Sequence, residues 1–344
     1  MANVLVTGGA GYVGSVCCAE LLRAGHSVVV VDDLSTGFRQ VVPPGIPLRQ
    51  SDIADPRAMW LLFSENKFDA VFHFAAKALV PESVSNPGVF FQQNVAGGIS
   101  FLEAVRAAGV KKFVFSSSAA VYGAPQTVPI DEEHAKEPTN SYGETKLMLE
   151  RALEWYALAY HWSVVALRYF NAAGATEAAG ERHQPETHII PLLLQTAAGE
   201  RDFFTLYGDD YSTPDGTCVR DYVHVSDIAA AHLLALDAMK TWGMTAYNIG
   251  CGQGYSVREV ISAVEDVAGK RIPLRLAPRR AGDPAVLCAN PAKLKRELGW
   301  EPSHSQLNTI IESAWIWKLQ HPRATWLPEA EPSQRVSGFA VPKL

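Results

Sequence analysis

Three residues of types that can move a proton stand in two short motifs near the middle of the chain. Ser118 lies in Val-Phe-Ser-Ser-Ser-Ala-Ala-Val-Tyr-Gly (114–123), and Tyr142 and Lys146 belong to Tyr-Gly-Glu-Thr-Lys (142–146). Positions i and i+4 share one face of a helix, so the phenol and the ammonium can converge on one point. The apolar run before Ser116 predicts a strand whose C-terminal end brings the Ser118 hydroxyl to that point.

This set has the chemistry to take a proton from an alcohol. A tyrosine acts as a base at neutral pH only if its pKa falls by about 3 units, or roughly 4 kcal/mol. One ammonium at about 4 Å, in a site of effective dielectric about 20, supplies an energy of that size. A Tyr-x-x-x-Lys spacing also arises by accident on helix surfaces, so its weight depends on the rest of the chain.

The N-terminal segment has the pattern of a dinucleotide-binding turn. An apolar strand from Asn3 runs into Gly8, Gly11 and Gly14, and a helical pattern follows that ends at Gly25. The glycines allow a tight turn, and the start of the helix faces a pyrophosphate. The strand, turn and helix therefore predict a bound dinucleotide.

A second predicted strand, 27–33, ends in a carboxylate. Asp32 follows the glycine turn by about 20 residues, where an acid is expected to bind a ribose hydroxyl. A carboxylate there would repel a 2′-phosphate. The cofactor is thus expected to be NAD rather than NADP.

Further short apolar runs alternate with helical patterns, which predicts an α/β fold with a Rossmann-type, doubly wound parallel sheet. The runs are 68–76, 111–118 and 163–171, and the helices between them include 89–107 and 142–160. Ligands bind at the C-terminal ends of such strands. Residues 1–171 are therefore expected to form the NAD-binding domain.

After residue 171 the pattern predicts a smaller mixed α/β lobe, 172–344, that binds substrate. Its expected helices are 188–199, 226–239, 256–269, 291–298 and 305–317, and its strands are 203–207 and 246–250, with a turn-rich loop over 209–220. Segments at about 220–250 are expected to return to the first domain. The Pro-rich, polar tail, 322–344, is expected to be loosely ordered.

Composition excludes several classes of partner. The formal charge of −6 argues against nucleic acid and anionic membranes, and no apolar run approaches the ~20 residues of a membrane span. Five cysteines without a CxxC spacing and an N-terminus that enters a strand directly lead us to expect a cytoplasmic protein. Two His-x-x-Glu spacings, His134/Glu137 and His183/Glu186, lie in proline-containing loops. We interpret both as accidental and expect no metal.

Taken together, these motifs resemble the extended short-chain dehydrogenases that act on nucleotide sugars, and within them the UDP-glucose 4-epimerase group. The resemblance covers nearly the whole chain. Its motifs are Thr-Gly-Gly-Ala-Gly-Tyr-Val-Gly (7–14), His-Phe-Ala-Ala (73–76), the segments with Ser118, Tyr142 and Lys146, Arg-Tyr-Phe-Asn (168–171), the stretch 207–225, Tyr-Asn-Ile-Gly (247–250) and Pro-Arg-Arg-Ala-Gly-Asp (278–283).

The resemblance implies roles for matching residues. Tyr142 would be the base, Lys146 its partner, and Ser118 a hydrogen-bond bridge to the sugar. The implied NAD site comprises Gly8, Gly11, Tyr12, Val13, Gly14, Asp32, Asp33, Leu34, Asp52, Ile53, Phe74, Ala75, Asn94, Ser116, Tyr142, Lys146 and Tyr169. The implied substrate site comprises Ser118, Tyr142, Asn171, His188, Thr205, Tyr207, Arg220, Tyr222, Arg280, Asp283 and Leu287.

Three positions depart from the group's pattern. His188 stands where an asparagine is usual, which puts a diphosphate contact there in doubt, and Lys77 lies one place early, so its NAD contact is not carried over. At Leu287 a tyrosine is associated with excluding N-acetylated sugars and a small residue with admitting them. Leucine is intermediate, so UDP-N-acetylhexosamines stay open as substrates.

The implied activity is reversible, NAD-dependent inversion at C4 of UDP-glucose and UDP-galactose through a 4-keto sugar, by a homodimer. A nucleotide-sugar 4,6-dehydratase would need an Asp/Glu pair where this chain has Ala119 and Ala120. A UDP-xylose/UDP-arabinose 4-epimerase shares most of the motifs and stays open. A non-enzymatic NAD-sensing regulator would have no need of Ser118, Tyr142 and Lys146.

Overall fold

The computed structural model describes residues 1–280 and 283–322, so the predicted loose tail lies outside the described residues except for Pro322. Its centre is a seven-stranded sheet in the order β10-β6-β5-β4-β1-β2-β3, and every pairing is parallel. The strands are β1 (Asn3–Thr7), β2 (Ser27–Asp32), β3 (Leu48–Gln50), β4 (Ala70–His73), β5 (Lys112–Ser118), β6 (Ser163–Tyr169) and β10 (Gly243–Ile249). The predicted doubly wound parallel sheet is confirmed.

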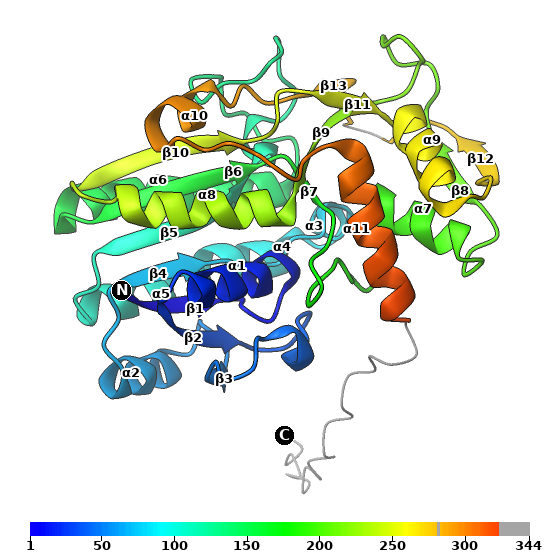
Figure 1. Cartoon of the computed structure of the whole chain (residues 1–344). Helices are drawn as coiled ribbons and strands as arrows, with labels where there is room; N and C mark the ends of the chain where they lie inside the picture. Colours follow the sequence, from blue (N-terminus) through cyan, green and yellow to red (C-terminus); the bar gives the residue numbers. More distant parts are fainter. Residues whose placement is uncertain (281–282, 323–344) are drawn as a thin grey trace, which may run out of the picture.

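Helices cover both faces of this sheet (Figure 1). One face packs on α1 (Tyr12–Arg23), α8 (Val225–Ala238) and α10 (Ala292–Leu298), and the other on α2 (Pro56–Glu65), α5 (Gly98–Ala107) and α6 (Ser141–Tyr160). The inner strands are almost wholly buried because apolar side chains meet a helix layer on either side, whereas the edge strand β3 is largely exposed. All the strands point the same way, so their carboxyl ends form one edge.

A second region lies beyond that edge. It holds a four-stranded sheet of β7 (Asn171–Ala173), β9 (Val219–His224), β11 (Gly254–Ser256) and β13 (Val286–Leu287), and a pair of β8 (Phe204–Tyr207) and β12 (Leu274–Ala277). Three helices share an apolar core with β8: α7 (Ile189–Ala197), α9 (Val257–Ala268) and α11 (Leu307–Gln320). Between β9 and this region's later strands, the chain returns to the first sheet through α8 and β10.

One predicted helix differs in its interior. The expected 89–107 helix is built from α4 (Pro87–Phe90), a π-helical stretch η2 (Phe91–Gly97) and α5. Asn94 lies in the widened turn, where its amide bonds the Lys77 backbone at 2.8 and 3.0 Å and Thr145 of α6 at 3.0 Å. These tertiary bonds explain why the regular helical pattern gives way there.

The expected loop over 209–220 was too long at its C-terminal end, because β9 begins at Val219. This strand alternates polar and apolar residues weakly and pairs with segments from three other parts of the chain. Such pairing leaves little local signal. The remaining short helices, α3 (Val80–Ser85), η1 (Arg39–Val41) and η3 (Ala119–Tyr122), lie in connections.

Candidate active site

The three proton-transfer candidates lie together at the carboxyl edge of the sheet. Ser118 is the last residue of β5, and Tyr142 and Lys146 lie in the first turns of α6, which begins after the N-cap Asn140. Ser118 and Tyr142 are hydrogen-bonded, and Lys146 Nζ lies 5.8 Å from the centre of the Tyr142 ring. Lys146 donates to the Ser116 carbonyl oxygen at 2.8 Å. A phenol, a hydroxyl and an amine therefore share one site.

Burial sets the protonation of this group. It raises the pKa of Tyr142, against which the hydrogen bond with Ser118 acts. Burial lowers the pKa of Lys146 to about 7, and the charge of Glu150 opposes this shift. Burial, together with the charge of Lys146, lowers the pKa of His73 to about 3. His73 is thus neutral, while the Lys146 amine is poised between charged and uncharged forms near neutral pH. A lysine in that state can exchange a proton with a neighbouring phenol.

The glycine turn places the start of α1 at the same edge. A side chain at Gly8 would meet the Ala75 backbone nitrogen at 2.6 Å, and one at Gly14 would meet the Gly8 carbonyl oxygen at 2.2 Å. The α1 N-cap, Gly11, provides no side-chain cap, and the first turn holds no acidic residue. The first backbone N–H groups of α1 are therefore open to an anion, as a pyrophosphate site requires. Tyr12 and Val13 form that first turn.

Asp32 ends β2 beside this turn. Its carboxylate accepts hydrogen bonds from the backbone nitrogens of Ala10 and Leu34, each at 2.9 Å, and its side chain is buried. Burial raises its pKa above the usual value, and the two backbone bonds act against this. Leu34 has a left-handed φ of 60°. Asp33 accepts from Ser35 instead.

The other predicted NAD residues follow strand ends along this edge. Asp52 and Ile53 come after β3, Phe74 and Ala75 after β4, and Tyr169 ends β6 opposite Ser118. Tyr169 pairs with His232 of α8 at 2.7 Å. Ser116 lies in β5 and Asn94 in η2. The residues present fit a dinucleotide laid across the edge, with its phosphates at α1.

Apart from Ser118 and Tyr142, the predicted substrate residues lie in the second region. Asn171 of β7 is opposite Tyr222 of β9, and Leu287 of β13 is opposite Arg220. Arg220 lies 3.7 Å from Asp283. The Arg280 guanidinium stacks over the Tyr207 ring at 4.2 Å, and Thr205 lies on the same strand as Tyr207. Leu287 packs on the cluster containing Ala119 and Leu147, so it links this region to the segments that bear Ser118 and Lys146.

His188, the N-cap of α7, is held by two carboxylates. Its Nδ1 is 2.8 Å from Glu181 Oε1 and 3.0 Å from Glu186 Oε1. Although burial lowers the pKa of His188, these carboxylates raise it to about 10. His183 joins the same group, so the His183/Glu186 spacing that we interpreted as accidental belongs to a cluster of four side chains.

Sequence reasoning missed several residues that position the site. Asn140 caps α6 by accepting from the Gly143 nitrogen at 2.9 Å, and an Asn two residues before Tyr142 was an available signal. His232, which pairs with Tyr169, and Glu181, which joins the histidine cluster, carry no local motif. Their partners are distant in sequence or lie in an irregular loop.

Comparison with known proteins identifies the family. The model of the NAD dependent epimerase/dehydratase family matches residues 4–250. A UDP-glucose 4-epimerase of Corynebacterium glutamicum is 49% identical over 92% of this chain and 95% of its own. A crystal structure of UDP-glucose 4-epimerase from Brucella ovis in complex with NAD has a TM-score of 0.89 and 44% identity, over 92% of this chain and 98% of that one.

A crystal structure of UDP-glucose 4-epimerase from Bifidobacterium longum in complex with NAD+ and UDP has a TM-score of 0.89 and 38% identity, covering 93% of this chain and 99% of that one. The glycine turn, the Ser118, Tyr142 and Lys146 site and these likenesses agree. The chain belongs to the NAD dependent epimerase/dehydratase family and, within it, to the UDP-glucose 4-epimerases.

Proposed function

We propose that this enzyme reversibly inverts C4 of a UDP-hexose, converting UDP-galactose and UDP-glucose through a 4-keto sugar, with NAD as its cofactor. The observation that carries the proposal is the meeting of Ser118, Tyr142 and Lys146 at the sheet edge onto which the uncapped start of α1 opens. The NAD-bound relatives described above support the choice of cofactor.

Tyr142 is proposed to remove the C4 hydroxyl proton and later to return it. Bound NAD supplies a reversible hydride acceptor for C4. The Ser118 hydroxyl bridges the sugar oxygen and the phenol, and a protonated Lys146 lowers the pKa of Tyr142 in the step that needs a base. The keto sugar presents its opposite face before it is reduced, so the proton goes back to an oxygen on an inverted carbon.

The UDP part is proposed to bind on the second region. Arg220 and Arg280 offer guanidinium groups to the diphosphate, and guanidinium–phosphate hydrogen bonds are charge-assisted. Asn171, Thr205, Tyr207, Tyr222 and Asp283 lie on or beside the same strands. His188 is held by two carboxylates, so we assign it no contact with the diphosphate.

A 4,6-dehydratase would need an acid and a base directly after Ser118, and this chain has neither there. Ala119 and Ala120 begin η3, and neither side chain can move a proton. If the protein were only an NAD-sensing regulator, the buried amine of Lys146 would have no function in it. Leu287 is intermediate in size between the tyrosine associated with excluding N-acetylated sugars and the small residue associated with admitting them. N-acetylated and pentose UDP-sugars are therefore to be tested directly as substrates.

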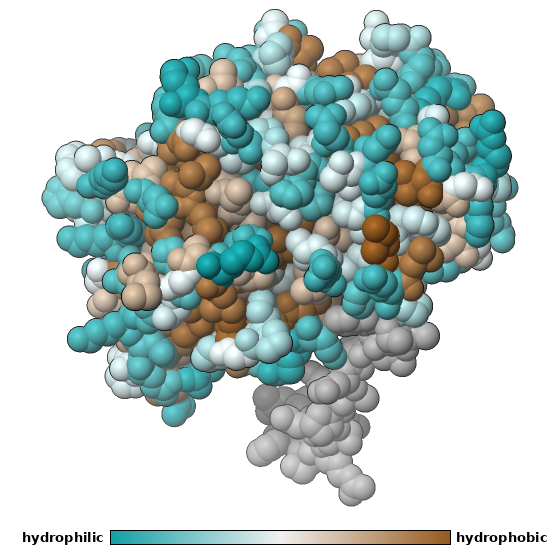
Figure 2. All heavy atoms as spheres, in the orientation of Figure 1, coloured by the Kyte–Doolittle hydropathy of each residue, from teal (hydrophilic) through white to brown (hydrophobic). Residues whose placement is uncertain are grey.

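We further propose a cytoplasmic homodimer. The five cysteines are all free, which suits a reducing compartment. Figure 2 shows polar side chains over most of one face, with small apolar patches between them. Trp155 and Leu158 of α6 are 71% and 50% exposed, and Phe91 of η2, which packs beside α6, is 37% exposed. A partner that packs against α6 and η2 would bury these exposed apolar side chains. Within the described residues, none of the helices is long and apolar enough to cross a membrane.

The proposal is tested with protein purified without added nucleotide. UDP-galactose should be converted to UDP-glucose by NAD that copurifies, and UDP-N-acetylglucosamine and UDP-xylose tested in parallel rank the sugars. An Asp32→Ala variant is the matched control, because it should need added NAD for the same conversion. Absence of conversion by wild-type protein with saturating NAD would refute the proposal.

A further inference from the structure

A loop between β7 and α7 brings four potential metal ligands together. Glu181, His183, Glu186 and His188 each contribute one ligand atom, and these atoms all lie within 4.8 Å of one another. The residues alternate carboxylate and imidazole over eight positions. None of them belongs to the proton-transfer set of Ser118, Tyr142 and Lys146.

The distances suit a small tetrahedral ion. His188 Nδ1 lies 2.8 Å from Glu181 Oε1 and 3.0 Å from Glu186 Oε1, and His183 Nδ1 lies 3.3 Å from Glu181 Oε1. Around zinc, with bonds of about 2.0–2.2 Å, neighbouring ligand atoms are roughly 3.4 Å apart. The widest pair in the cluster would have to close by at most roughly 1.4 Å.

Charge also favours a cation. The side chains of Glu181 and Glu186 are 8% and 3% exposed. Within residues 1–280 and 283–322, every ion pair of these two carboxylates runs to His183 or His188. Buried carboxylates are normally paired with cations or coordinate metals. Glu186 also accepts from the backbone nitrogens of Thr187 and His188, and a divalent ion would neutralise both carboxylates together.

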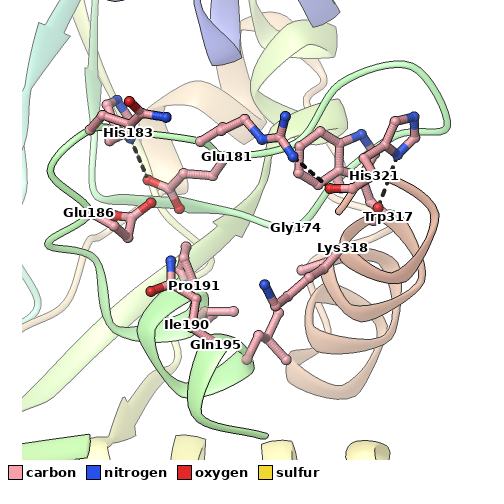
Figure 3. Close-up of a pocket in the computed structure, with 15 residues that line it drawn as sticks. Gly174, Glu181, His183, Glu186, Ile190, Pro191, Gln195, Trp317, Lys318 and His321 are labelled. Atoms are coloured by element: carbon pink, nitrogen blue, oxygen red, sulfur yellow. Dashed lines mark hydrogen bonds and ion pairs between the residues drawn. The ribbon is translucent and has the colours of Figure 1, made fainter. Parts of the chain in front are cut away.

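His183 has the least well satisfied ligand atom of the four. Its Nδ1 atom is buried and lies 3.3 Å from Glu181 Oε1, but it makes no well-aligned hydrogen bond among the described residues. Figure 3 shows His183, Glu181 and Glu186 directed towards one another at one end of the pocket between α7 and α11. A buried imidazole nitrogen whose carboxylate neighbour is poorly aligned for a hydrogen bond is only partly satisfied, and an ion between the two would satisfy both.

We propose that Glu181, His183, Glu186 and His188 form a binding site for one Zn²⁺ ion. Two imidazole nitrogens and two carboxylate oxygens in a tetrahedral set suit zinc, whereas Mg²⁺ and Ca²⁺ take oxygen ligands in larger shells. The ion holds the 174–188 loop in place beside α7. It also occupies the Nδ1 atom of His188, which keeps this imidazole away from the substrate diphosphate.

The loop also meets the cofactor side of the molecule, so the proposed ion has a structural role there. The Tyr12 hydroxyl, in the first turn of α1, donates to the Gly174 carbonyl oxygen at 2.6 Å. At its other end the pocket is lined by Trp317, Lys318 and His321 from α11 and the residue after it. A fixed loop therefore connects the first turn of α1 with the last turn of α11.

The test is metal content of the full-length protein after its affinity tag is removed. Wild-type protein should be stripped with a chelator, incubated with a small excess of ZnSO₄, desalted and analysed by mass spectrometry for zinc. We expect one zinc per chain, with a melting temperature several degrees above that of the stripped protein. Cobalt in place of zinc should give the intense visible absorption of a tetrahedral site, and excess MgCl₂ should not remove it.

His183→Gln should abolish stoichiometric zinc and the cobalt spectrum. His134→Gln is the matched control, because His134 belongs to the other His-x-x-Glu spacing, where it contacts Asp131 and Thr127 instead of a second imidazole. The control should keep one zinc. Wild-type protein that retains no zinc would overturn the site, as would a folded His183→Gln variant that binds zinc as wild type does. If His183→Gln does not fold, the wild-type zinc content and cobalt spectrum still decide.

Discussion

Two buried cations lie close to one another and are held in opposite ways. Lys146 of α6 donates to the Ser116 carbonyl oxygen, and burial lowers its pKa to about 7. Arg168 of β6 is bound by both oxygens of Glu150 at 2.7 and 3.0 Å and donates to the Tyr122 hydroxyl at 2.7 Å. Burial acts against the charge of Arg168, but Glu150 raises its pKa.

The contrast shows that Arg168 stabilises the fold, whereas Lys146 is suited to proton transfer. A guanidinium with both carboxylate oxygens on it keeps its charge at every pH and fastens α6 to β6. An amine with a single carbonyl acceptor and no bonded carboxylate can lose its proton near neutrality. The same helix therefore carries a fixed link at Glu150 and, one turn earlier, a group that can take part in proton transfer.

Replacing Lys146 should give the largest effect, and this effect is on catalysis. Lys146→Met keeps most of the buried volume but removes the charge that favours the Tyr142 phenolate. We expect epimerisation of UDP-galactose to slow by about 10²-fold to 10⁴-fold. The free energy of unfolding should fall by no more than about 1 kcal/mol relative to wild type. A variant that unfolds easily, or one that turns over normally, would remove the contrast.

Glu150→Gln should have the opposite profile. It leaves the Arg168 charge buried without a carboxylate, which typically costs about 3–5 kcal/mol of stability. Denaturant unfolding measures that loss, and kcat should fall by less than about tenfold where the variant is folded, since no atom of Glu150 is assigned to the reaction. Loss of kcat without loss of stability would place Glu150 in the chemistry instead.

Arg168→Lys should have a smaller effect on stability. The charge is kept, but an ammonium cannot hold both oxygens of Glu150 in a planar fork. Hydrogen bonds to charged groups are worth about 1.5–3 kcal/mol, so the loss in unfolding free energy should lie in that range. An unchanged midpoint in urea would mean that the fork geometry contributes nothing.

The last expected effect, smaller per pH unit than the losses above, is a pH dependence of stability that belongs to Lys146. Its folded pKa of about 7 is below its unfolded value of about 10.4, so the unfolded chain binds more protons between these values. Stability due to this residue therefore rises with pH across that window, by at most about 1.4 kcal/mol per pH unit. The difference in unfolding free energy between wild type and Lys146→Met should change accordingly from pH 7 to 9. A flat difference would show that the amine is not depressed.

Features with local patterns could be predicted from the sequence. The glycine turn, Asp32 at the end of a strand, and the Tyr142 and Lys146 spacing each lie within one or two elements, so periodicity and turn chemistry revealed them. The family resemblance added the substrate residues, whose roles stay predictions.

Features that join distant segments could not be predicted. The Arg168–Glu150 link connects a strand and a helix, and the pairing of Arg220 with Leu287 joins strands more than sixty residues apart. The Glu181–His188 cluster depends on the path of an irregular loop, which no periodic pattern describes. Its His-x-x-Glu spacing alone could not be told from that at His134 and Glu137, where the side chains do not converge in the same way.

The central claim is that Tyr142 moves the proton, and Tyr142→Phe tests it most directly. The variant removes one oxygen atom and leaves the glycine turn, Asp32 and Lys146 in place. Purified with its bound NAD and given UDP-galactose, it should form UDP-glucose at a rate lower by about 10²-fold to 10⁴-fold, with NAD content equal to wild type. A rate close to that of wild type, with NAD bound, would contradict the account.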